Sequence, residues 1–157
     1  LFALQGALNG INQAIGKEIL AILPEEMNGM PKEETGDDVT GINTGFAGLF
    51  ISRSYTAEDR NASIEIVSDS PLLAGINTIL AMPGFMTSDE NQKRIKIEGY
   101  KALLTRNTDG EGMVSYDLQM PFSGSLLTFQ CDGVEDENEV ITMAKKIPVD
   151  EIVTIAR

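Results

Sequence analysis

Apolar and polar residues alternate along two stretches in the second half of the chain. The alternation covers residues 114–120 and returns at 127–131. A period of two predicts β-strands that have one apolar and one polar face. Together with K-R-I-K-I-E-G-Y-K-A-L-L-T-R at 93–106, these stretches predict three consecutive strands, a β-meander. Gly99, inside the first of them, predicts a bulge or a bend.

A second group of strands is predicted upstream of the meander. One lies within residues 46–57, which contain G-L-F-I-S-R-S-Y-T, and the other is A-S-I-E-I-V-S at 62–68. Arg60 and Asn61 lie between them and predict a turn. These two strands are therefore expected to form a hairpin.

Apolar residues spaced by three and four predict helices before, between and after these strands. Ser70 and Pro71 suit the start of the second helix, and Asp136 and Glu139 have the spacing of a capping box at the third. At the C-terminus a short helix is favoured over a strand. The predicted helices cover residues 1–23, 71–82, 136–147 and 149–157.

The order of these elements predicts one α+β domain. Its centre is an antiparallel sheet of about five to six strands, built as hairpin, crossover helix and meander. Because only one face of the sheet is apolar, the helices are expected to pack on that face and shield it from water. Along the 157 residues we expect an amphipathic helix at 1–24, an acidic loop at 25–44 and the sheet core at 45–157. The loop is rich in Gly, Pro and acidic residues, which predicts exposure.

Composition excludes several classes of function. The chain has 24 Asp and Glu against 12 Lys and Arg, a net charge of −12, which repels phosphate backbones and argues against nucleic acid. It has no histidine, the commonest general base and metal ligand, so we expect no enzyme, no cofactor and no metal site. The single cysteine, Cys131, ends an apolar stretch and predicts a buried thiol. No run approaches 18 apolar residues, so no transmembrane segment is expected.

Four segments of the chain resemble a family of uncharacterised exported bacterial proteins. They are I-S-R-S-Y at 51–55, S-I-E-I-V-S-D-S-P-L-L at 63–73, I-E-G-Y-K-A-L-L at 97–104 and K-K-I-P-V-D-E-I at 145–152. The family commonly has Leu-Pro at the end of its first helix, as at positions 23 and 24, and often a Trp that this chain lacks. The resemblance implies a periplasmic or otherwise exported setting and brings no catalytic residues with it. Since the chain begins with Leu1, we expect a processed or truncated product.

The element order after Gly45 also resembles the PsbP-like fold of thylakoid-lumen photosystem subunits. With the missing histidine, this favours a non-enzymatic binding or interaction module of the bacterial envelope, with an unknown protein partner. The polar sheet face is the expected binding surface, and the candidate residues on it are Arg53, Tyr100, Lys101, Arg106 and Asp117. We expect a monomer, or a homodimer that pairs through the first helix.

Two alternatives stay open. The chain could carry a small apolar ligand between the sheet and the helix at 71–82. The apolar residues that gather there are Leu72, Leu73, Ile76, Ile79, Met82, Phe85 and Met86. Alternatively, Glu65 and Asp117 could form a carboxylate pair for acid–base catalysis, although nothing in the sequence places them together.

Overall fold

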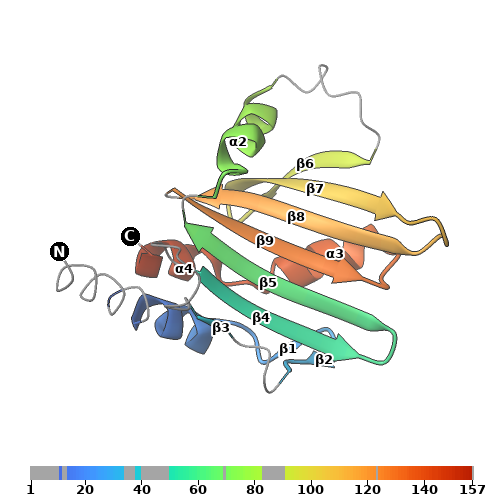
Figure 1. Cartoon of the computed structure of the whole chain (residues 1–157), viewed down its shortest axis with the longest axis horizontal. Helices are drawn as coiled ribbons and strands as arrows, with labels where there is room; N and C mark the ends of the chain where they lie inside the picture. The colour runs from blue at the N-terminus through green and yellow to red at the C-terminus, as the bar shows by residue number, and fades with distance from the viewer. Residues whose placement is uncertain are drawn as a thin grey trace.

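The computed structural model describes residue 11 and residues 14–33, 38–39, 50–68, 70–82, 91–122 and 124–156. In this part of the chain the protein is α+β, with an antiparallel sheet in the order β3-β4-β5-β9-β8-β7-β6 (Figure 1). The strands of this sheet are β3 (Asp38–Val39), β4 (Phe50–Ala57), β5 (Arg60–Ser68), β6 (Gln92–Ile97), β7 (Tyr100–Thr108), β8 (Val114–Phe122) and β9 (Ser125–Asp132). The predicted fold class is confirmed.

The chain builds this sheet from both ends toward the middle. The β4–β5 hairpin forms one side, α2 (Leu73–Ala81) crosses to the far edge, and β6, β7, β8 and β9 return as a meander. The last strand of the meander, β9, pairs antiparallel with β5 and joins the two halves. The predicted order of hairpin, crossover helix and meander is therefore confirmed.

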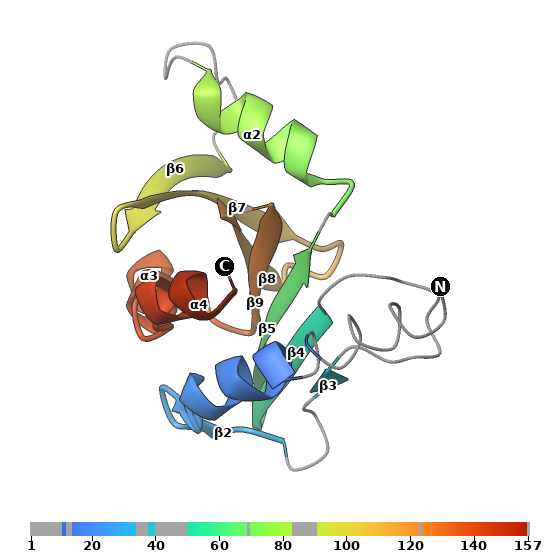
Figure 2. The same ribbon diagram turned by 90° about the vertical axis from the view of Figure 1, so that its left-hand side faces the viewer.

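One face of the sheet, the covered face, holds the main core. Along β8 every second residue is buried, and Phe129 on β9 is fully buried. Three helical segments pack on this face (Figure 2): residues 14–22, α3 (Glu137–Ala144) and α4 (Val149–Ala156). Each fully buried side chain of Leu or Phe size contributes about 1.5–3 kcal/mol, so this one face supplies most of the stability.

Helix α2 lies on the opposite face, and here the predicted one-sided packing is wrong. Ile76 and Leu80 of α2 pack against two leucines of the sheet, Leu103 on β7 and Leu126 on β9. The side chains of both leucines are on the face of the sheet that is otherwise polar. The cause is in the sequence, since A-L-L at 102–104 places an apolar residue on both faces of the sheet. A small apolar patch on the second face requires a cover of its own. We call this second face the open face.

The segment predicted as an exposed acidic loop, 25–44, contains ordered structure. Strands β1 (Glu26–Met27) and β2 (Met30–Pro31) form a small hairpin, and Met27 and Met30 are fully buried in the main core. Further along, β3 pairs with β4 at the sheet edge. The predicted loop is therefore wrong where these strands form and where Met27 and Met30 are buried, whereas the acidic residues Glu25, Glu26 and Glu33 are exposed as expected. Residues 34–37 and 40–44 lie outside the described residues.

Two predicted turns are displaced along the chain. The β4–β5 turn is Glu58-Asp59, because Ala57 pairs with Arg60 and Asn61 is already in the strand. Gly99 does not form a bulge; Glu98 and Gly99 form a two-residue turn between β6 and β7, with φ of 50° and 88°. Positive φ at both positions is the signature of a tight type I′ hairpin. The segment 93–106 is therefore two strands.

The helix ends follow local chemistry. Residues 14–22 are helical, and Ile19 and Leu23 enter the main core, as expected for a helix docked on its own sheet. At α3 the Asp136 carboxylate accepts from the Asn138 amide at 3.0 Å, but Glu139 binds Arg60 at 3.0 Å and does not close a capping box. The short helix expected at the C-terminus is confirmed as α4.

Gly133 joins β9 to α3 at a point where the backbone passes close to the β4–β5 turn. Its φ is +82°, and an added Cβ would lie 2.5 Å from the Asp59 carbonyl oxygen. Gly112 has a similar φ of +85°, with nothing within 4 Å of its Cβ position. The two glycines therefore differ only in the clash.

We predict that Gly133→Ala lowers the free energy of unfolding by about 1–3 kcal/mol more than Gly112→Ala does, the usual cost of overpacking. Both variants incur the same backbone strain, so the difference isolates the contact with Asp59. Urea denaturation of the two variants measures it. Equal losses would contradict the close approach.

Candidate functional site

The five residues predicted for the polar sheet face lie on both faces of the sheet. Lys101 and Asp117 are on the open face, as predicted. Arg53, Tyr100 and Arg106 are on the covered face, because they share the strand parity of buried core residues. For these three the predicted placement is wrong. The signal was present: Arg53 stands two residues from both Ile51 and Tyr55.

Arg53 closes the end of the first helix. Its side chain is only 3% exposed, and its guanidinium donates to the carbonyl oxygens of Leu23 at 3.0 Å and Pro24 at 3.4 Å. The Tyr55 hydroxyl donates to the same Pro24 oxygen at 2.6 Å. A cation at the negative end of a helix satisfies carbonyls that lack an intrahelical partner. This arrangement fixes the helix to β4 and leaves the charge inaccessible to a ligand.

Tyr100 also has a packing role. Its hydroxyl donates to the Asp150 carboxylate of α4 at 3.1 Å, and the Asp150 amide donates to the Glu98 carboxylate at 2.9 Å. The β6–β7 turn is thereby fastened to the first turn of α4. A carboxylate at a helix N-terminus is favourable because it accepts a free backbone N–H.

Arg106 is exposed at the rim of the covered face. It lines a cavity of about 370 Å³ beside the start of α3, together with Lys93 and the acidic residues Glu135, Asp136 and Glu137. Lys93 already pairs with Glu137 at 2.8 Å. Because three carboxylates accompany two cations here, this cavity is not an attractive site for an anion.

Asp117 is half-buried on the open face and accepts a hydrogen bond from the Asn107 amide at 3.0 Å. Burial raises the pKa of the Asp117 carboxyl, the Asn107 bond partly offsets this, and Asp132 adds to the rise. Glu65, its proposed catalytic partner, is on the same face, but β9 lies between their strands. Strand spacing puts their Cα atoms roughly 10–12 Å apart, too far for direct proton transfer.

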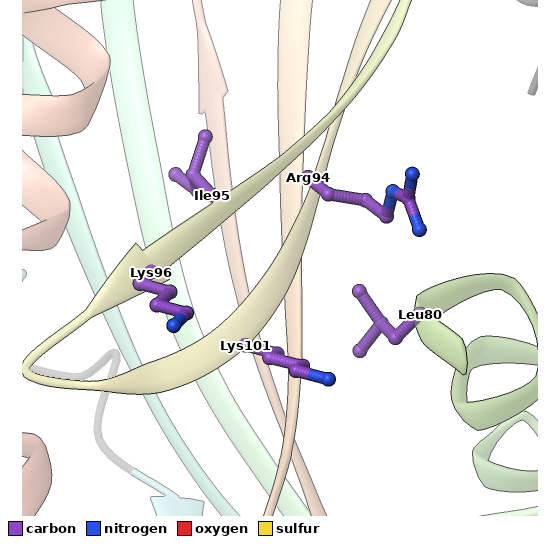
Figure 3. A pocket seen from close by; sticks show the side chains of 5 residues that line it. All are labelled: Leu80, Arg94, Ile95, Lys96 and Lys101. Carbon is purple, nitrogen blue, oxygen red and sulfur yellow. The ribbon is translucent and has the colours of Figure 1, made fainter. Parts of the chain in front are cut away.

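Lys101 lines a groove that was not predicted from the sequence. The groove has a volume of about 370 Å³ and lies between the β6–β7 hairpin and α2. In Figure 3, Arg94 and Lys101 extend from the two strands toward Leu80 on α2, while Ile95 points to the other side. Its lining residues are Leu80, Arg94, Ile95, Lys96 and Lys101. We call it the cationic groove, since three of these five described lining residues are basic and none of the five is acidic.

The two lysines of the groove face each other directly. Lys96 on β6 and Lys101 on β7 are cross-strand partners, one position away from the Ile97–Tyr100 pair at the turn. In a two-residue hairpin the pair next to the turn is hydrogen-bonded, so the next pair is not, and its side chains are closer. Like charges at such a pair destabilise the sheet. The pairing follows from the sequence only once the Glu98-Gly99 turn is placed correctly.

The three cations of the groove differ in their partners. The Arg94 guanidinium donates to the carbonyl oxygen of Met82, the C-cap of α2, and so ties that helix to β6. Among the described residues, Lys96 and Lys101 have no ion pair or side-chain hydrogen bond. Arg94 thus holds the two walls of the groove together, whereas the charges of Lys96 and Lys101 are available to a ligand.

The region proposed for an apolar ligand is closed where it is described. Ile76, Leu80, Leu103 and Leu126 are all buried against one another, and Leu72 is exposed. Phe85 and Met86, the other expected lining residues, lie outside the described residues. The cavity next to this cluster is the cationic groove, whose described lining is mainly basic.

Cys131 is fully buried on the covered face, which confirms the predicted buried thiol. Burial is the main cause that raises the pKa of the thiol to about 12, and the neighbouring Asp132 adds to it. The thiolate is therefore scarce at neutral pH, and Cys131 is not a nucleophile in the folded protein.

Comparison with known proteins gives no relative: no family model, curated protein or solved structure matches the chain. Within the described ranges, no helix is both long enough and apolar enough to cross a membrane. In the same ranges, no three cysteine or acidic side chains are grouped to hold a metal ion.

We predict that Arg53→Met lowers the free energy of unfolding by about 1–3 kcal/mol, because it leaves the Leu23 and Pro24 carbonyls with fewer donors in a buried setting. Arg106→Met removes the same charge from the exposed rim of the same face and should change stability by less than about 0.5 kcal/mol. Thermal and urea unfolding measure both. Similar effects in the two variants would contradict the role given to Arg53.

Asp117 gives a pH dependence whose sign is fixed by its raised pKa. The folded protein holds this proton to higher pH than the unfolded chain does, so ionising Asp117 costs stability as the pH rises above its ordinary pKa. We predict that Asp117→Asn gains stability relative to wild type between about pH 3 and pH 7. Unfolding free energies across this range test it, with Glu111→Gln in an exposed loop as the control for removing one charge. A gain that is independent of pH would contradict the assignment.

Proposed function

We propose that this protein is a non-enzymatic binding module whose ligand presents carboxylate or phosphate groups to the cationic groove. The observation that carries the proposal is the Lys96–Lys101 pair, two lysines at directly opposite strand positions that have no ion pair or side-chain hydrogen bond among the described residues. An anion between them would convert a repulsive contact into two charge-assisted hydrogen bonds, each worth about 1.5–3 kcal/mol.

Protection of a sheet edge explains only part of this arrangement. Edge strands often carry lysine and arginine, which prevent pairing with other chains. That accounts for Arg94 and Lys96, because β6 is the outermost strand on its side. It does not account for Lys101, which is on the inner strand β7. A second lysine placed directly opposite the first favours a bound anion.

The surroundings of the groove restrict the ligand further. Leu80 forms an apolar wall on the α2 side, so a ligand with an apolar part beside its anionic group fits best. The net charge of −12 over the whole chain repels long polyanions such as nucleic acids. The proposed ligand is therefore one with few, locally placed negative charges.

The setting of the module is a separate proposal. We place it in the bacterial envelope, as a periplasmic or otherwise exported protein, on the sequence resemblance alone. The protein partner expected there would contribute the anionic group. A catalytic role for the acidic residues of the open face receives no support from the separation of Glu65 and Asp117.

We predict that Lys96→Gln with Lys101→Gln abolishes anion binding. The probes are inorganic phosphate and succinate, which separate phosphate from carboxylate recognition, and the readout is the NMR shift of the β6–β7 backbone amide signals, which wild type and variants share. The double variant should weaken binding of the preferred probe at least tenfold, because two charge-assisted hydrogen bonds are lost. Lys17→Gln with Lys145→Gln makes the same charge change at two exposed positions elsewhere and should leave binding unchanged.

A second experiment tests the repulsion between Lys96 and Lys101. Lys101→Glu should raise stability by about 0.2–1 kcal/mol, because it turns a like-charge pair into an opposite-charge pair, and it should also abolish binding. Gain of stability with loss of binding is typical of a residue kept for function. Equal weakening of binding by the two double variants, or saturation by neither probe, would overturn the proposed function.

A further inference from the structure

We infer that the anionic ligand is an extended acidic peptide segment that adds to the free edge of β6 as a further strand. This rests on the proposed function and deepens it, because it names the chemical class of the partner. The supporting features are the edge of β6, with which no described strand pairs, the direction of its backbone groups, and the groove cations that lie on and beside this strand.

The hairpin geometry decides which backbone groups of β6 are free. Ile97 forms the hydrogen-bonded pair next to the turn, and every second residue repeats that state. The hydrogen bond from the Arg106 amide to the Asn91 carbonyl at 2.7 Å agrees with this alternation. The N–H and C=O groups of Gln92, Arg94 and Lys96 therefore point away from β7, and no described strand pairs with that edge.

Lys96, one of these residues, and its cross-strand partner Lys101 carry the available charge of the groove. Arg94 and Lys96 have their side chains on the open face, where Lys101 stands beside them. A peptide strand added to this edge places every second side chain on the open face as well. Acidic side chains at those positions reach the cations while the backbone bonds to the edge. Main-chain bonds then give affinity, and the alternating carboxylates give specificity.

The charge of the edge also decides against a second copy of this chain. Two β6 edges side by side would bring Lys93, Arg94 and Lys96 of one copy against the same residues of the other. Like charges directly opposite each other are destabilising, so the edge rejects itself. An acidic segment meets the opposite condition. The strand has six residues, which offers a peptide about 20 Å of edge.

The experiment uses an eight-residue peptide of alternating Glu and Thr, with both ends blocked. Two analogues carry backbone N-methyl groups, one on every Glu and the other on every Thr. Both analogues keep the charge of the parent, but each removes one alternate row of N–H donors. Calorimetric titration into the full chain should show that one analogue binds at least tenfold more weakly and that the other binds like the parent.

The groove variants separate the two levels of the proposal. Lys96→Gln with Lys101→Gln should weaken the parent peptide at least tenfold, and Lys17→Gln with Lys145→Gln should not. If both methylated analogues bind like the parent while the groove variant fails, the edge addition is overturned and the anion site stands. The same holds if the peptide does not bind while phosphate or succinate still shifts the β6–β7 amide signals. If the groove variant binds the peptide like wild type, both proposals are overturned.

Discussion

A single sheet face that must be kept from water governs the rest of this structure. The covered face runs across the six longer strands, and residues 14–22, α3 and α4 together conceal it. Buried or partly buried polar links hold these covers in register. Arg53 fastens the first helix to β4, and Arg60 joins β5 to α3 through Glu139 and to the β1–β2 turn through the Asn28 carbonyl. Hydrophobic area supplies the stability, and these links decide which helix lies where.

The open face is mainly polar, and among the described residues only α2 packs on it. Helix α2 conceals the few apolar residues that the strand alternation leaves there, and its C-cap carbonyl is held by Arg94. That contact sets one wall of the cationic groove, and the Glu98-Gly99 turn sets the other by placing Lys96 opposite Lys101. A structural need, the cover of a small apolar patch, thus creates a groove whose described lining is mainly cationic.

The sequence alone predicted the sheet and most of its order, because β8 and β9 alternate cleanly. It failed where the alternation is broken or shifted. In the run A-L-L at 102–104 three consecutive residues are apolar, so the pattern does not show which alternate residues face the core. Tyr100 and Arg106 were therefore assigned to the wrong face. Arg53 was misplaced because a charged residue is rarely buried, although its parity indicated burial. The groove was missed because a bend at Gly99 does not define which residues of the two strands pair. A two-residue turn at Glu98-Gly99 does define this pairing and places Lys96 opposite Lys101.

Strand β5 finds its partner late in the synthesis of the chain. It pairs with β9, and residues 69–124 lie between the two strands. At a synthesis rate of about 5–20 residues per second, the β4–β5 hairpin waits several seconds on the ribosome before β9 emerges. During that time Ile64 and Ile66 lack β9 and the helices α3 and α4, although β4 and the helical residues 14–22 have already been made. The newly made hairpin is thus the segment most exposed to mispairing, and long-range pairing of this kind slows folding of the whole domain.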